Sequence, residues 1–259
     1  MLADERRRAI LASLQSDGAV RVADLAEALS VSEMTVRRDL DVLDSQDLLR
    51  KVHGGAVTRH HRGEEPRSAE KARHMRAEKV AIAESAAALV GDGMTIAIGA
   101  GTTTTELARV LRGRSSITVI TNSISVFEVL TASGADDRPV AYLSGGARTP
   151  SDALVGPIAD GALASFRTDA TFLGVHGLDV DAGLTSPNIA EAQTNRALID
   201  IAARLVVLAD HTKYGEVGTN VFARLDQVDT LVVDEGLDVA ERVALEGLVG
   251  ELIVAGTAQ

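Results

Sequence analysis

The stretch Val31-Ser-Glu-Met-Thr-Val-Arg-Arg-Asp-Leu-Asp-Val-Leu43 decides the fold of the first part of the chain. Val36, Leu40 and Leu43 recur at the spacing of one helical face, so a helix here buries an apolar stripe and turns the two consecutive arginines away from it. Ser32 precedes the stripe and is a candidate N-cap. The stretch therefore predicts an amphipathic helix with an outward pair of positive charges.

Three further segments surround this helix. Residues 18–29 give a second helical period just before it, and two short helices across a tight turn make a helix-turn-helix. Residues 3–15 carry an apolar face and end near Gly18, which suits a supporting first helix. Residues 48–57 are typical of two short strands with a glycine-rich bend, and we interpret them as a wing.

The outward side chains of the helix in residues 31–43 and of the wing are expected to contact DNA. The first turn of a helix that enters a major groove meets base edges and phosphates, and arginines bind guanine edges or phosphate oxygens. The predicted DNA-binding residues are Ser32, Thr35, Arg37, Arg38, Arg50, Lys51 and His53. Taken alone, the thirteen quoted residues fit a plain surface helix better, and it is the neighbouring helix and wing that favour DNA.

These residues also match a known pattern. The run Ser32-x-x-Thr35-Val36-Arg37-Arg38-Asp39-Leu40, followed by Leu43, Leu49-Arg50 and His53-Gly54-Gly55-Ala56, resembles the amino-terminal winged helix-turn-helix of the DeoR family of bacterial transcriptional regulators. The resemblance covers residues 1–57, which we take as the first domain.

Composition limits what the whole chain does. Its 259 residues suffice for one large domain or two ordinary ones, and they contain no cysteine, which excludes disulfides, thiolate catalysis and cysteine-based zinc sites. The charged start Met1–Arg8 does not resemble a signal peptide, and no apolar run approaches the roughly 20 residues of a membrane span. We therefore expect a cytoplasmic protein without membrane contact.

The net charge of −11 is unusual for a DNA-binding protein, but the charge is unevenly distributed. Residues 1–79 hold 15 Lys/Arg against 14 Asp/Glu, a balance of +1, whereas residues 80–259 hold 11 against 23, a balance of −12. The first domain is thus not strongly basic. Its DNA affinity should depend on a few well-placed arginines and on dimerisation.

Residues 58–75 are polar, mixed in charge and without an apolar period, so we interpret them as a linker. The histidines in it, His60, His61 and His74, lack carboxylates at fixed helical spacing, and solvated linker histidines are favoured over a metal site. No metal and no cofactor is predicted.

Residues 76–259 alternate helical stretches with short apolar runs. The runs expected to be strands are Met94–Ile98, Ile117–Thr121, Val140–Leu143, Ala170–Val175, Leu205–Ala209, Leu231–Val233 and Leu252–Val254. Such a pattern predicts an α/β domain with a doubly wound parallel sheet covered on both faces. A ligand site is then expected at the carboxyl ends of the strands.

Polar and glycine residues collect at these strand ends. Gly99-Ala-Gly-Thr-Thr-Thr-Thr-Glu106 opens a helix after the first strand, and glycines, unpaired N–H groups and hydroxyls suit a phosphate. The Lys-Ser/Thr ending of a nucleotide P-loop is absent. The predicted effector-binding residues are Gly99, Gly101, Thr102, Thr103, Thr104, Thr121, Asn122, Ser123, Gly145, Gly146, Asp179, Asp210 and Lys213. Any one of them could instead be a structural cap.

The order of these strand ends resembles the carboxy-terminal sensor domain of DeoR-family proteins, which is similar to ribose-5-phosphate isomerase. The resemblance implies a phosphorylated sugar as effector, with the phosphate at Gly99–Thr105 and the sugar facing Asp210 and Lys213. It further implies a repressor of carbohydrate genes that binds double-stranded operator DNA as a homo-oligomer, dimer or tetramer. Activation instead of repression stays open.

The competing hypothesis is a sugar-phosphate isomerase-like enzyme with an appended DNA-binding domain. By the resemblance, such an enzyme needs a glutamate base where this chain has Asn195, 18 residues before Lys213, and an amide cannot act as a base. His176 stands where an acid is expected, although Glu191 and Asp179 are near in sequence. We therefore predict no enzyme and no catalytic residue. A third class, an architectural DNA protein without ligand, leaves the polar strand ends unexplained.

Overall fold

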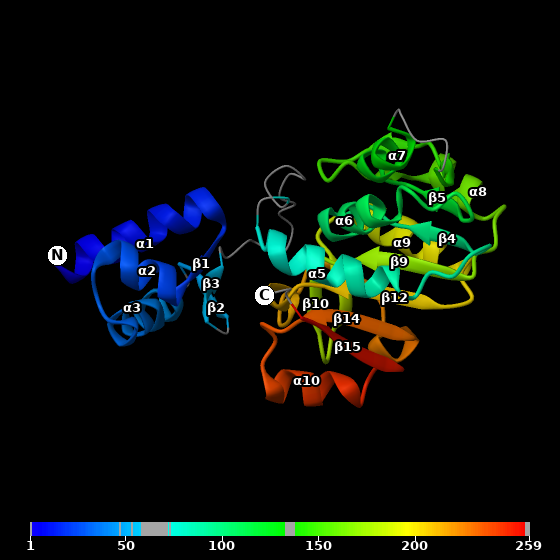
Figure 1. Cartoon of the computed structure of the whole chain (residues 1–259). Helices are drawn as coiled ribbons and strands as arrows, with labels where there is room; N and C mark the ends of the chain where they lie inside the picture. Colours follow the sequence, from blue (N-terminus) through cyan, green and yellow to red (C-terminus); the bar gives the residue numbers. More distant parts are fainter. Residues whose placement is uncertain are drawn as a thin grey trace. The chain divides into compact units, whose positions relative to one another are not determined.

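The computed structural model describes the chain in two compact units, Met1–His61 and Arg62–Gln259 (Figure 1). The residues described are 2–46, 48–52, 54–57, 72, 74–132 and 138–256. Each unit has a hydrophobic core of its own. The linker prediction for residues 58–75 falls mostly outside the described residues, and with it His60 and His61.

The first unit is a winged helix-turn-helix, as predicted. Its elements are α1 (Ala3–Asp17), β1 (Ala19–Arg21), α2 (Val22–Leu29), α3 (Glu33–Ser45), β2 (Arg50–Val52) and β3 (Gly55–Val57). Gly18, with φ 68°, ends α1, and Ser30, with φ 53°, ends α2. Ser32 then caps α3 by accepting a hydrogen bond from the backbone N–H of Thr35 at 3.2 Å. The predicted N-cap is therefore confirmed.

The predicted apolar stripe of α3 lies in the core of this unit. Val36 and Leu40 are 0% exposed and Leu43 is 2% exposed. They pack with Ile10 and Leu14 of α1 and with apolar residues of α2. Burying such a stripe is what stabilises a short helix, because its backbone hydrogen bonds alone are marginal in water.

A third strand in the sheet of the wing corrects the prediction for residues 18–29. The helix begins only at Val22, and the preceding residues form β1, which pairs antiparallel with β3 in the order β1-β3-β2. Gly55 makes this pairing possible, since a Cβ on it would lie 2.1 Å from the carbonyl oxygen of Val20. A contact between residues so far apart is invisible to a helical period.

The second unit contains a seven-stranded parallel sheet in the order β15-β14-β12-β9-β4-β5-β6 (Figure 1). The strands are β4 (Thr95–Ile98), β5 (Thr118–Thr121), β6 (Val140–Leu143), β9 (Ala170–Gly174), β12 (Leu205–Ala209), β14 (Thr230–Asp234) and β15 (Glu251–Ala255). All seven predicted strands are confirmed, and so is their parallel arrangement.

Helices cover both faces of this sheet, which confirms the doubly wound architecture. Along β4, Ile96 and Ile98 face one core, together with residues of α5 (Arg76–Ala87), α6 (Thr102–Leu111) and α7 (Ile124–Thr131). Ala97 faces a second core, which contains residues of the remaining helices. These are α8 (Pro157–Leu163), α9 (Ile189–Asp200) and α10 (Val239–Glu246). Alternation along each strand therefore divides the apolar side chains between two layers.

Short antiparallel strands that the prediction did not contain complete the second unit. They are β7 (Ala147–Arg148), β8 (Leu154–Val155), β10 (Gly177–Asp179), β11 (Gly183–Ser186) and β13 (Asn220–Ala223). The last three form a sheet in the order β10-β11-β13, and β7 pairs with β8. They follow the carboxyl ends of β6, β9 and β12, so they frame the edge at which a ligand site is expected.

Candidate functional site

The outer surface of α3 carries the predicted pair of arginines. Arg37 and Arg38 are exposed, and so is Ser32, while Thr35 is half-buried at the first turn. The guanidinium of Arg37 lies 3.3 Å from the Glu33 carboxylate one turn earlier, an exposed pair of the kind that holds a side chain along its helix only weakly. Both arginines thus lie outside the core, and their contact with DNA remains a prediction.

A buried acid between these arginines and the core was not predicted to have a role. Asp39 is 3% exposed, and its carboxylate accepts hydrogen bonds from Arg6 Nε at 2.5 Å and from Arg7 Nε at 3.1 Å. This arrangement ties α1 to α3. Its sequence signal is an acid among the apolar positions of α3, next to Leu40.

The wing places Lys51 beside α3. Its ammonium forms an ion pair with Asp41, and its backbone N–H donates to Asp44 Oδ1 at 3.4 Å. Arg50 is half-buried at the start of the same strand. The predicted contact of His53 lies outside the described residues.

In the second unit, the glycine-rich loop after β4 leads directly into a helix N-terminus. Gly101 is the N-cap of α6, whose first residue is Thr102. A Cβ on Gly101 would lie 3.2 Å from Thr104 Oγ1 and 3.9 Å from the Cα of Gly174 at the end of β9. A side chain at residue 101 would therefore crowd the Thr104 hydroxyl and reach the neighbouring strand end.

Two of the four threonines that follow form hydrogen bonds within the first turn of the helix. Thr104 and Thr105 donate their hydroxyls to the carbonyl oxygen of Gly101, at 2.9 and 2.7 Å. Thr102 is half-buried and Thr103 is buried, both in the first turn of α6. The N–H groups of this first turn supply the positive end of the helix dipole, which favours an anion.

Thr121, Asn122 and Ser123 are buried and hold the strand ends together. The Asn122 side chain accepts from Ala100 N–H at 3.1 Å and donates to Leu154 O at 3.1 Å, so it joins the glycine-rich loop to β8. The Thr121 hydroxyl donates to Ile98 O at 2.6 Å, across to β4. Ser123 caps α7 by accepting from Val126 N–H. These residues support the loop, and their contact with an effector remains a prediction.

Gly145 and Gly146 form the turn between β6 and β7. Both have positive φ, 74° and 121°, and a Cβ on Gly146 would lie 2.7 Å from Val155 O. Only glycine fits this second position, where backbone meets backbone. The turn leads from β6 into the β7–β8 hairpin, which an isolated bridge between Ser123 and Ala153 connects to the end of β5.

A buried carboxylate follows β12, in the turn that the family resemblance expects to face the sugar. Asp210 is 2% exposed, and its Oδ1 accepts from Thr212 N–H at 3.2 Å and from the Thr212 hydroxyl. Burial alone would raise the pKa of the Asp210 carboxyl, but the charges of Lys213 and Lys79 and the Thr212 hydrogen bond hold that pKa below its ordinary value. Asp210 is thus charged and embedded beside two lysines.

Lys79 is the residue of this cluster that sequence reasoning missed. It lies on α5, is 4% exposed, and donates its ammonium to His74 O at 2.6 Å. A signal was available, because Lys79 stands three and four residues before Ile82 and Ala83 on the buried stripe of α5. A lysine on such a stripe is rarely buried unless it is paired.

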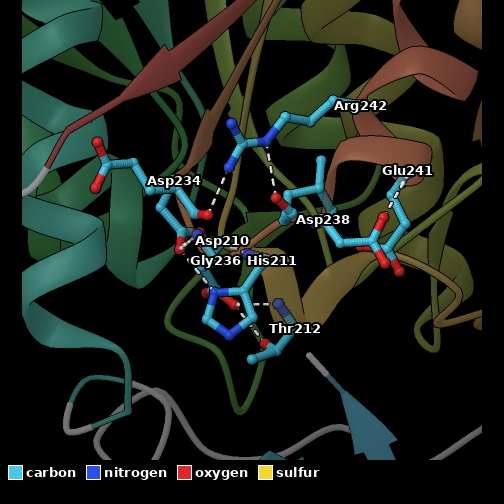
Figure 2. Close-up of polar contacts among 10 residues, drawn as sticks. Asp210, His211, Thr212, Asp234, Gly236, Asp238, Glu241 and Arg242 are labelled. Atoms are coloured by element: carbon cyan, nitrogen blue, oxygen red, sulfur yellow. Dashed lines mark hydrogen bonds and ion pairs between the residues drawn. The ribbon is translucent and has the colours of Figure 1, made fainter. Parts of the chain in front are cut away.

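The second missed feature is a histidine held by the acid that ends β14. The 3-10 helix η1 (His211–Lys213) places the His211 ring so that Nδ1 lies 2.7 Å from Asp234 Oδ2 (Figure 2). The side chain of His211 is 10% exposed and that of Asp234 is 2% exposed. Burial would lower the pKa of the imidazole, but Asp234, Asp210 and Glu78 raise it above its ordinary value.

The acids that an isomerase could use are engaged elsewhere. Asp179 Oδ1 accepts two backbone N–H groups, from Asp181 at 3.0 Å and from Ala182 at 2.8 Å, and so closes the turn between β10 and β11. Glu191 on α9 accepts from the hydroxyls of Thr149, at 2.6 Å, and of Ser151. These contacts anchor the β7–β8 hairpin to α9.

Asn195 is half-buried on α9, one turn after Glu191, and His176 is half-buried just beyond β9.

Among the described residues, no group of three or more histidines and acids is placed to hold a metal ion. In the same part of the chain, no helix combines the length and the apolar character needed to cross a membrane.

A winged helix-turn-helix with outward arginines, followed by an α/β unit with a charged strand-end site, defines the class of ligand-responsive DNA-binding regulators. Two family models match, the DeoR-like helix-turn-helix domain over residues 6–62 and the DeoR C terminal sensor domain over residues 74–235. The chain belongs to the DeoR family of transcriptional regulators, which confirms the resemblance noted in the sequence.

Two relatives extend this result over the full length. The HTH-type transcriptional regulator GlpR of Haloferax volcanii is 34% identical over 259 residues, covering 100% of both chains. The lactose phosphotransferase system repressor of Staphylococcus aureus is 32% identical over 232 residues, covering 89% of this chain and 91% of its own. Among solved structures, ribose 5-phosphate isomerase A of Methanocaldococcus jannaschii is 20% identical with a TM-score of 0.39, over 52% of this chain and 53% of the other.

Proposed function

We propose that this DeoR-family regulator is a repressor that a phosphorylated sugar releases from its operator. The observation that carries the proposal is the position of two complementary groups at one edge of one sheet. The glycine-rich loop follows β4, and the Asp210–Lys213 turn follows β12, with only β9 between them. Neighbouring strands lie about 4.8 Å apart, so the two groups are roughly 10 Å apart, which suits a sugar with one phosphate.

The two groups differ in chemistry, as the phosphate and the hydroxyls of a phosphorylated sugar require. The loop offers backbone N–H groups at a helix N-terminus, which suit a phosphate. The turn offers the buried carboxylate of Asp210 near Lys79 and Lys213, and a charged acceptor with ammonium donors suits sugar hydroxyls. The name of the Staphylococcus relative, a repressor of a lactose phosphotransferase system, supports the same class of effector.

We propose binding without turnover. Proton transfer between adjacent sugar carbons needs a free carboxylate base at the substrate. Asn195 occupies the expected position of that base, and the carboxylates of Glu191 and Asp179 accept hydrogen bonds from hydroxyls and from a turn. An isomerase with an appended DNA-binding domain is therefore the weaker hypothesis.

One winged helix contacts few base pairs, so useful specificity needs two copies at a fixed half-site spacing. We propose a homo-oligomer, a dimer or tetramer, assembled through the second unit because the first is too small to set that spacing. We also propose that the protein acts in the cytoplasm, where it would meet its operator.

Thermal unfolding of the full chain with phosphorylated and unphosphorylated sugars tests the effector. At least one sugar phosphate should raise the melting temperature, while its unphosphorylated form does not, and the same compound should reduce operator binding in a gel shift. Gly101→Val and Lys213→Ala should each abolish the stabilisation, the first by blocking the backbone and the second by removing a charge. Equal affinity for the unphosphorylated sugar would exclude the phosphate site, and isomer formation by the purified protein would exclude binding without turnover.

A further inference from the structure

The carboxylate of Asp234 accepts three hydrogen bonds at and around His211. Its Oδ1 accepts from the backbone N–H of His211 at 2.7 Å, and its Oδ2 is 2.7 Å from His211 Nδ1 (Figure 2). Oδ2 also accepts from the backbone N–H of Gly236 at 2.9 Å. One carboxylate thus holds both the backbone and the side chain of the same histidine.

Gly236 shows how closely the ring is held. A Cβ at this position would lie 2.3 Å from His211 Nδ1 and 2.7 Å from Asp234 Oδ2. Arg242 secures the same turn, since its guanidinium donates to Leu237 O at 2.7 Å and to Glu235 O at 2.5 Å (Figure 2). The ring is therefore positioned by two elements, β14 and α10, that lie outside the loops expected to contact the ligand.

The contact with Asp234 determines what the other ring nitrogen can do. A carboxylate accepts, so Nδ1 carries a proton and donates it, and Nε2 points away from Asp234. No hydrogen-bond partner of Nε2 is found within the described ranges, although the side chain is only 10% exposed. The hydrogen bond at Nδ1 sets the tautomer and the orientation of the ring, and so leaves Nε2 as the nitrogen that can meet another group.

The position of His211 decides which part of a ligand it meets. It follows Asp210 and precedes Lys213 by two residues, at the end of β12, which lies two strands away from β4 and its glycine-rich loop. A sugar with its phosphate in that loop would reach the turn with its hydroxyl end. We infer that His211 Nε2 forms a hydrogen bond to a sugar hydroxyl and helps to select the sugar, with Asp234 as its positioning residue. This inference rests on the proposed effector site and goes beyond the residues assigned to it above.

The charges around His211 support a protonated ring. Asp234 faces it from β14, Asp210 from the end of β12 and Glu78 from α5, and all three acids favour the imidazolium. Lys79 and Lys213 lie beside Asp210 and oppose it. A protonated His211 donates from Nε2 to a hydroxyl oxygen, and the neutral ring accepts from the same hydroxyl, so protonation changes the strength of the contact and not its partner.

A matched pair of variants tests the inference in the full chain. In His211→Asn the amide nitrogen takes the place of Nδ1, which keeps the contact with Asp234 and removes Nε2. In His211→Gln the amide nitrogen takes the place of Nε2. Calorimetric titration with D-ribose 5-phosphate, D-glucose 6-phosphate and D-fructose 1-phosphate, and with inorganic phosphate, should show a loss of about 10- to 100-fold for the preferred sugar phosphate in His211→Asn. Inorganic phosphate should bind both variants like the wild type, and His211→Gln should recover part of the loss.

Imidazole ¹⁵N spectra give a second measurement, because the resonances of a purely structural histidine would not respond to the sugar phosphate. The preferred sugar phosphate should shift the Nε2 resonance of His211, inorganic phosphate should not, and Asp234→Asn should redistribute the proton between the two nitrogens. Unchanged affinity of His211→Asn for the sugar phosphate, or an Nε2 resonance that the sugar phosphate leaves in place, would overturn the inference while the proposed effector stands. If none of the sugar phosphates binds the wild type, the proposed function is wrong, and so is this inference, which depends on it.

Discussion

At the scale of single residues, the Asp39 carboxylate joins two helices of the DNA-binding unit. It is almost fully buried, and both of its partners, Arg6 and Arg7, come from α1. Removing the carboxylate breaks both contacts between α1 and α3 and leaves two neighbouring arginines without their shared acid. Asp39→Ala should therefore lower the stability of the first unit strongly, as followed by calorimetry of the full chain.

Asp41→Ala on the same helix is the matched control for Asp39. Its carboxylate is 59% exposed and pairs only with Lys51. Exposed pairs contribute about 0–1 kcal/mol, so this variant should unfold nearly like the wild type. Equal destabilisation by the two substitutions would show that the contact of Asp39 with α1 contributes nothing special.

His211 predicts a pH dependence of stability in the second unit. Its folded pKa is raised, so the folded protein binds the proton more tightly than the unfolded chain does. This stabilisation is fully present below about pH 6.5, the unfolded value, and is lost as the pH rises through the raised pKa. The melting temperature of the second unit should fall across that window, and Asp234→Asn should make the profile flatter. A profile identical in wild type and Asp234→Asn would contradict the prediction.

At the scale of elements, α3 is expected to supply sequence specificity. If Arg38 forms a bidentate contact with a guanine, Arg38→Ala should weaken binding to the cognate site by about 1–3 kcal/mol and relax the preference at that base pair. Arg109→Ala on α6, where the arginine is 49% exposed, should change nothing. Gel shifts that show full operator affinity for an Arg37→Ala/Arg38→Ala double variant would exclude α3 as the reading element.

The wing should contribute affinity without specificity. Lys51 is paired with Asp41 in the protein alone, and a phosphate would compete for the same ammonium. Lys51→Ala should weaken binding to all sequences alike and lower the salt slope by about one. Asp41→Asn should have the opposite sign, because it removes the competing acid. A change in base preference for either variant would show that the wing contacts bases.

The elements that the sequence predicted correctly are those whose signal is local. The seven parallel strands are nearly continuous apolar runs because both of their faces are buried, and a short run between polar turns is recognisable without its partners. The antiparallel strands lack that signal. β10 reads Gly-Leu-Asp, and β11 pairs with β13 almost 40 residues later, as in the pairing of Leu184 with Ala223. Their strand character comes from partners that a sequence window does not contain.

The same limit applies to the candidate site. Asp210 and Lys213 were predicted from a family pattern, and their places at the end of β12 follow from the strand. Nothing in the sequence connects His211 with Asp234, which lies 23 residues later on a neighbouring strand. Lys79 lies more than 100 residues before Asp210, and only its place on the buried stripe of α5 indicates that it is a buried, paired lysine. Contacts across the sheet need the strand order, which the sequence did not provide.

At the scale of the whole molecule, the uneven charge separates two tasks. The balance of +1 in residues 1–79 should keep nonspecific attraction to DNA low, so we expect specific contacts and the proposed oligomerisation to determine occupancy. The balance of −12 in residues 80–259 keeps the sensor from competing for the phosphate backbone. A sensor joined to a DNA-binding unit regulates only if the effector favours one arrangement of the oligomer over another.

This requirement gives a prediction that can be measured from either side. A coupling of roughly 1–3 kcal/mol would change operator affinity about 5- to 150-fold, and by linkage operator DNA must weaken binding of the sugar phosphate by the same factor. Titrations of the full chain with effector, in the absence and presence of saturating operator, should give the factor seen in gel shifts with and without effector. Arg38→Ala serves as the control, since it should bind the effector with normal affinity. At operator concentrations too low for this variant to bind the DNA, operator should leave its effector affinity unchanged. Effector that binds the full chain but leaves operator affinity unchanged would exclude induction by release, and the second unit would then have a purpose other than control of DNA binding.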